Sequence, residues 1–309
     1  MIRSNRVSAM RARLMLSALL STVLIASSTG CDQSFRPAGR EVPGPAGSIA
    51  AAPLSGGRIA ILAGSPEAKG VFLIDETTGT VLRSFGVTKE ATGIAAETPD
   101  GPILLSIGAQ RDGRSIGAVE QWGLEGTKDR VVPLPSEALG ITRIQGGAAY
   151  ALLNGSNEAR AAIPIAVPAL RVGRAVPLDL GAHSLELCAS DAGDFLLYTD
   201  GARGFVVIRD VHTGGVAHSE SVADGATCVR ANNRAYAVVG GLLDRRISIM
   251  QLPTMVEIGS IPASRDALAL YENDASRLVA LNATRRVSTI ETFDQPWGEQ
   301  GASTVAVAR

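Results

Sequence analysis

The chain has 309 residues and a formal net charge of −1, with 46% hydrophobic and 19% charged residues. This balance excludes a strongly basic nucleic-acid-binding protein, and the apolar content excludes a chain that is too polar to form a core. Since the length alone allows one to three domains, the organisation has to be inferred from the predicted elements in chain order.

The first 30 residues have the pattern of a secretory signal. Four arginines precede a mainly apolar run, Leu14–Ser27, which is too short to span a bilayer comfortably. The run leads into Gly30 and Cys31, and a small residue directly before a cysteine at this place resembles a bacterial lipoprotein signal. The resemblance implies that Cys31 becomes the lipidated N-terminus; the alternative is an ordinary cleaved signal with an incidental cysteine.

Residues 31–47 contain several prolines and glycines and no apolar periodicity, so they are predicted to be a tether. Asp32 resembles a signal for retention on the inner membrane. We therefore expect a lipid-anchored protein of the bacterial cell envelope, on the outer leaflet or periplasmic side of the inner membrane. Removing residues 1–30 removes four arginines and leaves a charge near −5, so no nucleic-acid partner is expected.

Clusters of turn residues recur along the rest of the chain. They are Ser55–Gly57, Pro99–Gly101, Gln145–Gly147, Asp191–Gly193, Ala231–Asn233 and Asp274–Ser276. Counted from the last residue of each cluster, the intervals are 44, 46, 46, 40 and 43 residues. Periods of about 40–50 residues are typical of the four-stranded blades of a β-propeller.

Short apolar-rich segments follow each cluster and are predicted to be antiparallel strands. The second strands of the six units are Arg58–Ala63, Ile103–Ile107, Ala148–Leu153, Asp194–Tyr198, Arg234–Val239 and Arg277–Leu281. The third strands are Val71–Asp75, Ala118–Gly123, Ala161–Val167, Gly204–Arg209, Arg246–Gln251 and Arg286–Thr292. The fourth strands are Thr80–Phe85, Arg130–Leu134, Ala175–Leu180, Val216–Ser221 and Val256–Ile261.

The sixth unit lacks a fourth strand of its own. The C-terminal segment Ser303–Ala308 could supply it, and so could a strand just before Gly47, although that region is rich in proline. The third unit is expected to have a bulged or edge-like outer part, because proline cannot donate to a sheet ladder and this unit contains Pro164, Pro168 and Pro177. Residues 48–309 are therefore predicted to form a single all-β propeller of six four-stranded blades, closed by a terminal strand.

The best-preserved unit, Val71–Gly108, carries a resemblance to a known family. Its motifs are Ile74-Asp75, Thr78-Gly79, Gly93-Ile94-Ala95 and Pro99-Asp100-Gly101. In this order and spacing they resemble the YVTN-type repeat of WD40-like β-propellers. The resemblance implies the architecture and leaves the function open, because propellers support many unrelated activities. Members of the family are often seven-bladed, so seven blades remain the alternative count.

No sequence motif indicates an enzyme. The nucleophile elbow, the phosphate-binding loop and the dinucleotide-binding glycine pattern are all missing, and no cofactor is expected. His183, His212 and His218 lack metal-ligand spacing. Cys188 and Cys228 are interpreted as buried thiols in equivalent positions of adjacent innermost strands, with their pairing left open.

Arginines recur in the loops between predicted second and third strands. They are Arg111, Arg114, Arg160, Arg203, Arg245, Arg246, Arg285 and Arg286. In a propeller these loops emerge on one face around the channel mouth, so they form a candidate binding face for an envelope protein, an anionic polymer or a lipid phosphate. The alternative is that exposed loops simply carry soluble charges.

The predicted function is therefore that of an envelope-anchored, non-enzymatic binding or scaffolding lipoprotein. The alternative is a metal-dependent, lactonase-like hydrolase acting in the propeller channel. Six-bladed hydrolases of that type hold a divalent metal with carboxylate and amide side chains from the inner strands. The candidates for such a site are Glu97, Glu186, Glu272 and Asn233, but they are scattered in register and no metal site is predicted from them.

Overall fold

The computed structural model describes residues 40–293, with gaps at 97–99, 156–159, 191–192, 201–204, 222–225, 232–235, 242–245, 252–253, 264–266, 274–276 and 284–287. The predicted signal, Cys31 and Ser303–Ala308 lie outside the described residues. The chain divides into compact units Met1–Arg36 and Pro37–Arg309, and every described residue belongs to the second. A search of the described residues finds no helix with the length and hydropathy needed to cross a membrane.

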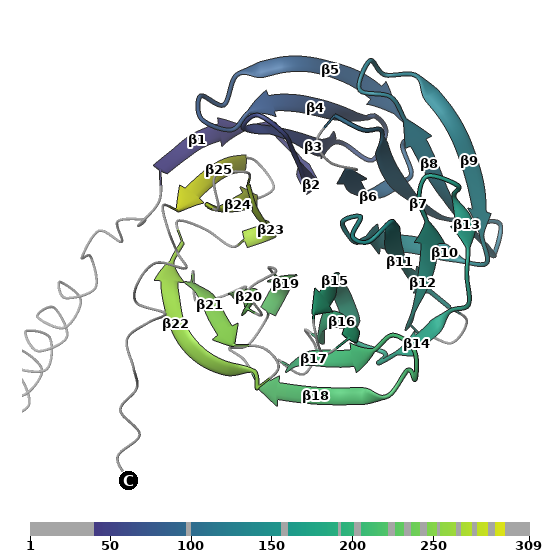
Figure 1. Ribbon diagram of the computed structural model, residues 1–309. Coiled ribbons are helices and arrows are strands. Elements are labelled where there is room, and N and C mark those ends of the chain that lie inside the picture. The colour runs from purple at the N-terminus through teal and green to yellow at the C-terminus, as the bar shows by residue number, and fades with distance from the viewer. Residues whose placement is uncertain are drawn as a thin grey trace, which may run out of the picture. The chain divides into compact units, whose positions relative to one another are not determined.

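Six antiparallel sheets stand around a central axis as the blades of a propeller (Figure 1). The first two blades are β2 (Ser48–Leu54), β3 (Arg58–Gly64), β4 (Lys69–Asp75), β5 (Val81–Val87) and β6 (Ala91–Ala96), β7 (Ile103–Arg111), β8 (Arg114–Trp122), β9 (Lys128–Leu134). The third blade comprises β10 (Glu137–Ile141), β11 (Ala148–Asn154), β12 (Arg160–Ala166), β13 (Arg171–Val172) and β14 (Val176–Leu178).

The remaining blades follow the same order from the axis outward. The fourth is β15 (Ala182–Ser190), β16 (Gly193–Asp200), β17 (Phe205–Asp210) and β18 (Val216–Ser221). The fifth is β19 (Ala226–Ala231), β20 (Tyr236–Gly241), β21 (Arg246–Gln251) and β22 (Val256–Pro262). The sixth contains β23 (Ala267–Glu272), β24 (Leu278–Ala283) and β25 (Ser288–Phe293). The prediction of an all-β, six-bladed propeller is confirmed.

The core consists of layers between neighbouring blades. In the first blade, residues 59–63 of β3 are buried because neighbouring blades cover both faces of this strand. This burial explains why its sequence is a continuous apolar run. Leu62 of this strand packs in one cluster with Ile94 and Leu105 of the second blade. The outermost strand β5, in contrast, is exposed along most of its length. Each blade is therefore stabilised by its neighbours, and the ring has to close to cover the last one.

The ring is closed from the N-terminal side. The strand β1 (Arg40–Gly44) pairs antiparallel with β25, with Arg40 opposite Thr292 and Gly44 opposite Ser288. Of the two predicted candidates, the proline-containing segment before Gly47 supplies the strand, and it lies within the range 31–47 that was predicted as tether. Pro43 is tolerated because β1 is the outermost strand, where a missing N–H breaks no bond to a further neighbour.

The outer part of the third blade is irregular, as its prolines predict. Instead of one fourth strand, two short pieces, β13 and β14, pair with different parts of β12. Pro177 stands in β14 at the outer edge, and the segment between the two pieces leaves the sheet. The predicted fourth strand Ala175–Leu180 is thereby reduced to Val176–Leu178.

A repeated turn joins third and fourth strands. In the first blade, Asp75 Oδ1 accepts the backbone N–H of Thr78 at 2.8 Å, and the N–H of Gly79, at φ +71°, bonds to the Asp75 carbonyl at 2.8 Å. Asp210 and Gly214 build the same turn in the fourth blade. Asp75 is therefore a turn residue, because its carboxylate caps the backbone as such turns require.

Because successive strands are antiparallel, the connecting loops divide between two faces of the ring. The hairpin face carries the loops from second to third strands and from one blade to the next: 45–47, 65–68, 88–90, 112–113, 135–136 and 179–181. The turn face carries the remaining loops, among them 55–57, 76–80, 123–127, 142–147 and 211–215. Both faces are needed to place the candidate sites.

Candidate functional site

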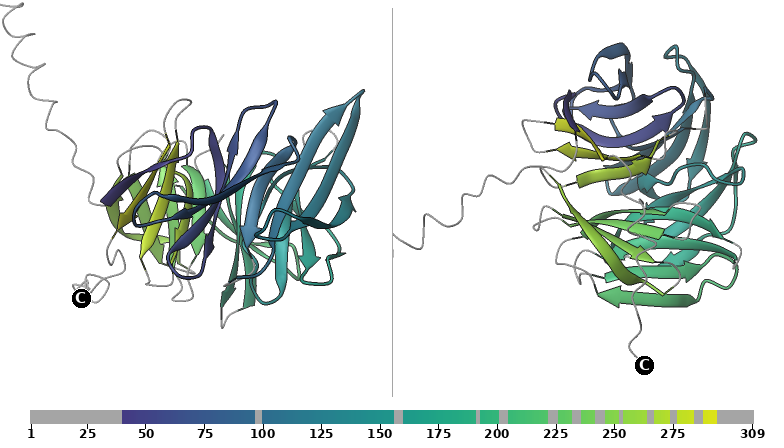
Figure 2. Two further views of the ribbon diagram at one scale, coloured as in Figure 1. Left: turned by 90° about the horizontal axis from the view of Figure 1, so that it is seen from above. Right: turned by 60° about the vertical axis from the view of Figure 1, so that its left-hand side comes forward.

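The hairpin of β7 and β8 extends from the hairpin face (Figure 2). Both strands have nine residues and are joined by Asp112 and Gly113, whose φ values of +51° and +71° belong to the two-residue turn that fits the twist of paired strands. Every residue from 110 to 116 is exposed. The predicted strand Ile103–Ile107 therefore continues to Arg111, and this extension carries Arg111 and Arg114 away from the ring.

The two arginines at the tip of this hairpin differ in their surroundings. Arg111 forms an ion pair with Glu90, which lies in the loop from the first to the second blade. Arg114 is exposed and forms no ion pair or side-chain hydrogen bond with the described part of the chain. Ile116 follows it on the same strand and is 42% exposed. The tip therefore presents a cation and an apolar side chain next to each other.

Arg160 is half-buried and belongs to a polar network. It donates through Nη1 to Asn154 Oδ1, and Asn154 Nδ2 donates to Glu137 Oε2 at 3.1 Å. Gln110 Nε2, at the hairpin, donates to the same Glu137 oxygen at 3.4 Å. The guanidinium of Arg160 is therefore held in contacts that join the second and third blades.

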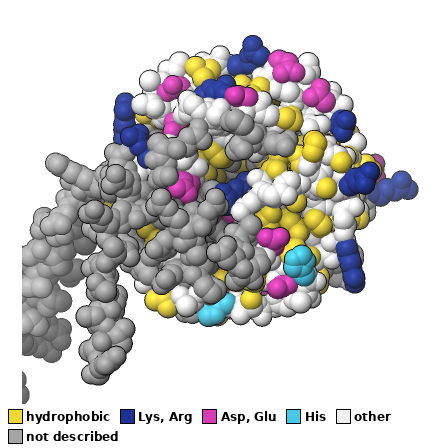
Figure 3. All heavy atoms as spheres, in the orientation of Figure 1, with side chains coloured by type: hydrophobic (Ala, Val, Ile, Leu, Met, Phe, Trp, Pro, Cys, Tyr) yellow, Lys and Arg dark blue, Asp and Glu magenta, His cyan; other side chains and the backbone are white. Residues whose placement is uncertain are grey.

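The other candidate arginines can be placed only by their position in the chain. Arg246 opens β21, but its side chain is outside the description. The rest lie outside the described residues: Arg203, Arg245, Arg285 and Arg286. In the described part, Glu90 and Glu137 stand among the arginines, so this part of the hairpin face has mixed charge. The face turned toward the viewer in Figure 3, which is not the one from which the hairpin projects, shows cations and carboxylates around the rim and hydrophobic side chains nearer the centre.

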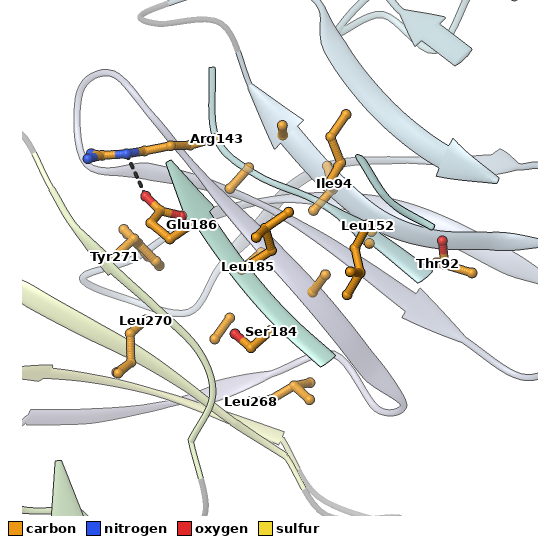
Figure 4. Close-up of a pocket in the computed structure, with 18 of the residues that line it drawn as sticks. Thr92, Ile94, Arg143, Leu152, Ser184, Leu185, Glu186, Leu268, Leu270 and Tyr271 are labelled. Atoms are coloured by element: carbon orange, nitrogen blue, oxygen red, sulfur yellow. Dashed lines mark ion pairs between the residues drawn. The ribbon is translucent and has the colours of Figure 1, made fainter. Parts of the chain in front are cut away.

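The axis of the ring holds a cavity of about 160 Å³, lined by residues of the innermost strands β2, β6, β10, β15 and β23 (Figure 4). On the first three blades the lining side chains are mainly small. Larger apolar side chains enter from the fourth and sixth blades, namely Leu185, Leu268 and Leu270. The described part of the channel is therefore narrow and mostly apolar.

An ion pair interrupts this apolar lining. Arg143 Nε lies 2.6 Å from Glu186 Oε1, and the two side chains are 23% and 9% exposed (Figure 4). Arg143 comes from the loop after β10, whereas Glu186 is in the middle of β15, so the pair joins the third and fourth blades. The sequence does not single out Arg143. It lies between a first and a second strand, outside the loops in which arginines recur, and one arginine before a turn forms no repeated pattern.

The candidates for a metal-dependent site do not meet in the described channel. Glu97 and Asn233 lie outside the described residues, and Glu186 is neutralised by Arg143. Glu272 ends β23 and is not among the residues that line the cavity. Across the described ranges, no group of three His, Cys, Asp or Glu side chains is arranged to hold a metal ion. Cys188 and Cys228 lie in the innermost strands of successive blades, and their side chains are outside the description.

These features define a class of protein, a six-bladed β-propeller with a narrow channel and a projecting hairpin on one face. No protein-family model matches the sequence. No curated protein matches it either. Among solved structures, the chain is similar to the crystal structure of a protein of unknown function from Bacteroides caccae, with a TM-score of 0.57 and 14% sequence identity over 74% of this chain and 83% of that chain. At this identity the likeness shows the fold alone.

Proposed function

We propose that this protein is an envelope-anchored binding or scaffolding lipoprotein, without enzymatic activity of its own, whose hairpin face contacts an envelope protein or an anionic polymer. In this proposal Cys31 carries the lipid, and the repeats are divergent copies of the YVTN type. The observation that carries the proposal is the projecting β7–β8 hairpin, where Arg114 and Ile116 are exposed side by side on one strand. Arginine flanked by apolar surface is the composition of interface anchors.

The hairpin is held in a defined position, which favours binding. Ser115 Oγ accepts the backbone N–H of Glu137 at 2.7 Å, and Gln110 bonds to the carboxylate of the same residue. These contacts fasten the hairpin to the third blade just below its tip. A partner therefore meets a surface that is already ordered, and association costs less conformational entropy than it would on a free loop.

The channel gives less support to the alternative of a metal-dependent hydrolase. Such an enzyme needs several ionised carboxylates that converge on one ion. In the described channel, Glu186 instead forms an ion pair with Arg143. The arrangement therefore favours a structural role for this carboxylate.

The proposal is tested by crosslinking in the native cell followed by mass spectrometry, with Arg114→Ser combined with Ile116→Ser. We expect the double variant to lose the crosslinked partners of the wild type while its melting temperature is unchanged, because both side chains are exposed. The matched control is Arg174→Ser, which removes an exposed arginine from the third blade's outer edge and should retain the partners. Recovery of the same partners with the double variant would refute the proposal.

A further inference from the structure

We propose that a pocket on the turn face, at the joint between the sixth and first blades, binds the phosphate of a membrane lipid headgroup. This joint pocket has a volume of about 150 Å³ and is lined by Arg40, Glu76, Thr77, Arg277 and Thr292. The assignment of the phosphate to a lipid rests on the proposed lipid anchor, whereas the affinity for a phosphate group rests on the pocket alone.

Ring closure brings these residues together. Arg40 is the first residue of β1 and lies opposite Thr292 of β25. Glu76 and Thr77 belong to the turn that follows β4, and Arg277 directly precedes β24. The pocket is therefore built from segments at opposite ends of the described chain, and it exists only when β1 closes the ring.

The carboxylate in the pocket is buried and bound to an internal donor. Glu76 is 7% exposed, and its Oε1 accepts a hydrogen bond from Asn273 Nδ2. Burial and the nearby Glu76 carboxylate raise the pKa of the Tyr271 hydroxyl well above its usual value, so this hydroxyl adds no second charge. Glu76 is thus turned into the protein rather than presented to an incoming ligand.

The remaining lining groups suit a phosphate. In the described part of the lining, two guanidinium groups stand beside one carboxylate, and the side chains of Thr77 and Thr292 add two hydroxyl donors. Arg277 also interacts with another group of the chain, so Arg40 is the arginine most available to a ligand. Arg40 is exposed and has no ion pair or side-chain hydrogen bond within the described chain. Guanidinium groups bind phosphate oxygens with charge-assisted hydrogen bonds, and two arginines exclude a metal cation. One water occupies about 30 Å³, and the cavity is several times larger than that, so a tetrahedral anion fits in it.

The position of the pocket identifies the source of the phosphate. Arg40 begins β1 at the turn face, and β1 runs from there to the hairpin face. Residues 32–39 separate Cys31 from Arg40, and a chain of this length spans at most roughly 30 Å. A lipid on Cys31 therefore keeps the joint pocket near the bilayer surface.

The phosphate group is tested first with inorganic phosphate and the chain 37–309, which keeps every described strand of the ring. The readout is the chemical shift of the Thr77 and Thr292 amides, with sodium chloride at equal ionic strength as the reference. We expect saturable shifts, and Arg40→Gln should weaken them roughly tenfold because one charge-assisted contact is lost. The matched control Arg174→Gln should have no effect. Absence of saturable shifts in the folded wild type would overturn the proposal.

The lipid source is tested with the same chain and sedimented vesicles of phosphatidylcholine and phosphatidylglycerol in equal amounts. We expect binding that Arg40→Gln reduces, that inorganic phosphate competes for, and that Arg174→Gln leaves unchanged. Phosphate binding without vesicle binding would assign the pocket to a free phosphate and refute the lipid source. In the full chain, Arg40→Gln should retain the crosslinked partners of the hairpin face, so failure of this inference is distinguishable from failure of the proposed function.

Discussion

Tyr198 shows how a single buried hydroxyl is held by charged neighbours. The residue is fully buried in the fourth blade, and its hydroxyl donates to Asp179 Oδ2. Arg209 Nη2 donates to the same hydroxyl at 3.2 Å and lies 3.6 Å from the Asp179 carboxylate. Burial, followed by the bond to Asp179, raises the pKa of Tyr198 to about 12. The folded protein therefore retains a proton that the unfolded chain loses near pH 10.

This difference predicts a loss of stability in alkali. The contribution of Tyr198 is fully present below about pH 10 and is lost as pH rises from 10 toward 12, by about 2 kcal/mol, since the folded state binds the extra proton. Tyr271 shifts in the same direction. Denaturant unfolding should therefore show the free energy of the wild type falling more steeply in this range than that of Tyr198→Phe. Parallel curves for the two proteins would contradict the assignment.

Asp75 and Asp100 show which part of a residue's role a local pattern can predict. Asp75 caps the turn of the first blade, and hydrogen bonds from the backbone and hydroxyl of Thr78 lower its pKa. Asp100 lies in a turn, as its cluster predicts, and it also accepts from Arg58 of the first blade. The first interaction spans three residues and can be read from the motif, whereas the second joins two blades and depends on their packing.

At the scale of the elements, the Arg143–Glu186 pair connects the loop after β10 with β15 across the channel. Both side chains are largely buried. Removing one of them takes a charged partner from the other at a site with limited access to water. The cost of such a change is larger than the net contribution of the pair itself.

We therefore expect Glu186→Gln to lower the free energy of unfolding by roughly 1–3 kcal/mol. The double variant Arg143→Met with Glu186→Leu should recover most of this loss, because it removes both charges from the channel. Denaturant unfolding of the wild type, Arg143→Met, Glu186→Leu and the double variant gives the coupling energy. Additive losses would show that the two side chains do not stabilise each other.

For the whole molecule, closure of the ring by β1 decides whether the last blade is covered. Val42 of this strand is 8% exposed and packs in one cluster with Ile59 of the first blade and Ile290 of the sixth. Without β1, the edge of β25 and this apolar cluster would be open to solvent. Exposed sheet edges of this kind favour pairing between chains.

A chain that begins at residue 45 should accordingly unfold at a lower temperature and associate, whereas a chain that begins at residue 37 should remain monodisperse. Size-exclusion chromatography and thermal unfolding of the two chains test this. Val42→Asp in the longer chain provides a milder version, since it keeps the strand and places a charge in the cluster. An equal melting temperature for all three would show that β1 is dispensable.

The amino-acid sequence by itself determined the repeat, the order of the strands and the irregular third blade. These features depend on turn residues, apolar runs and prolines that act over a few neighbouring positions, and the period of the turn clusters then indicates six blades. Only the tertiary structure decided that β1 closes the ring, that Arg143 meets Glu186 and that Arg40 and Arg277 share a pocket. Each of these contacts joins separate blades, and no local pattern along the chain encodes which loops the ring brings together.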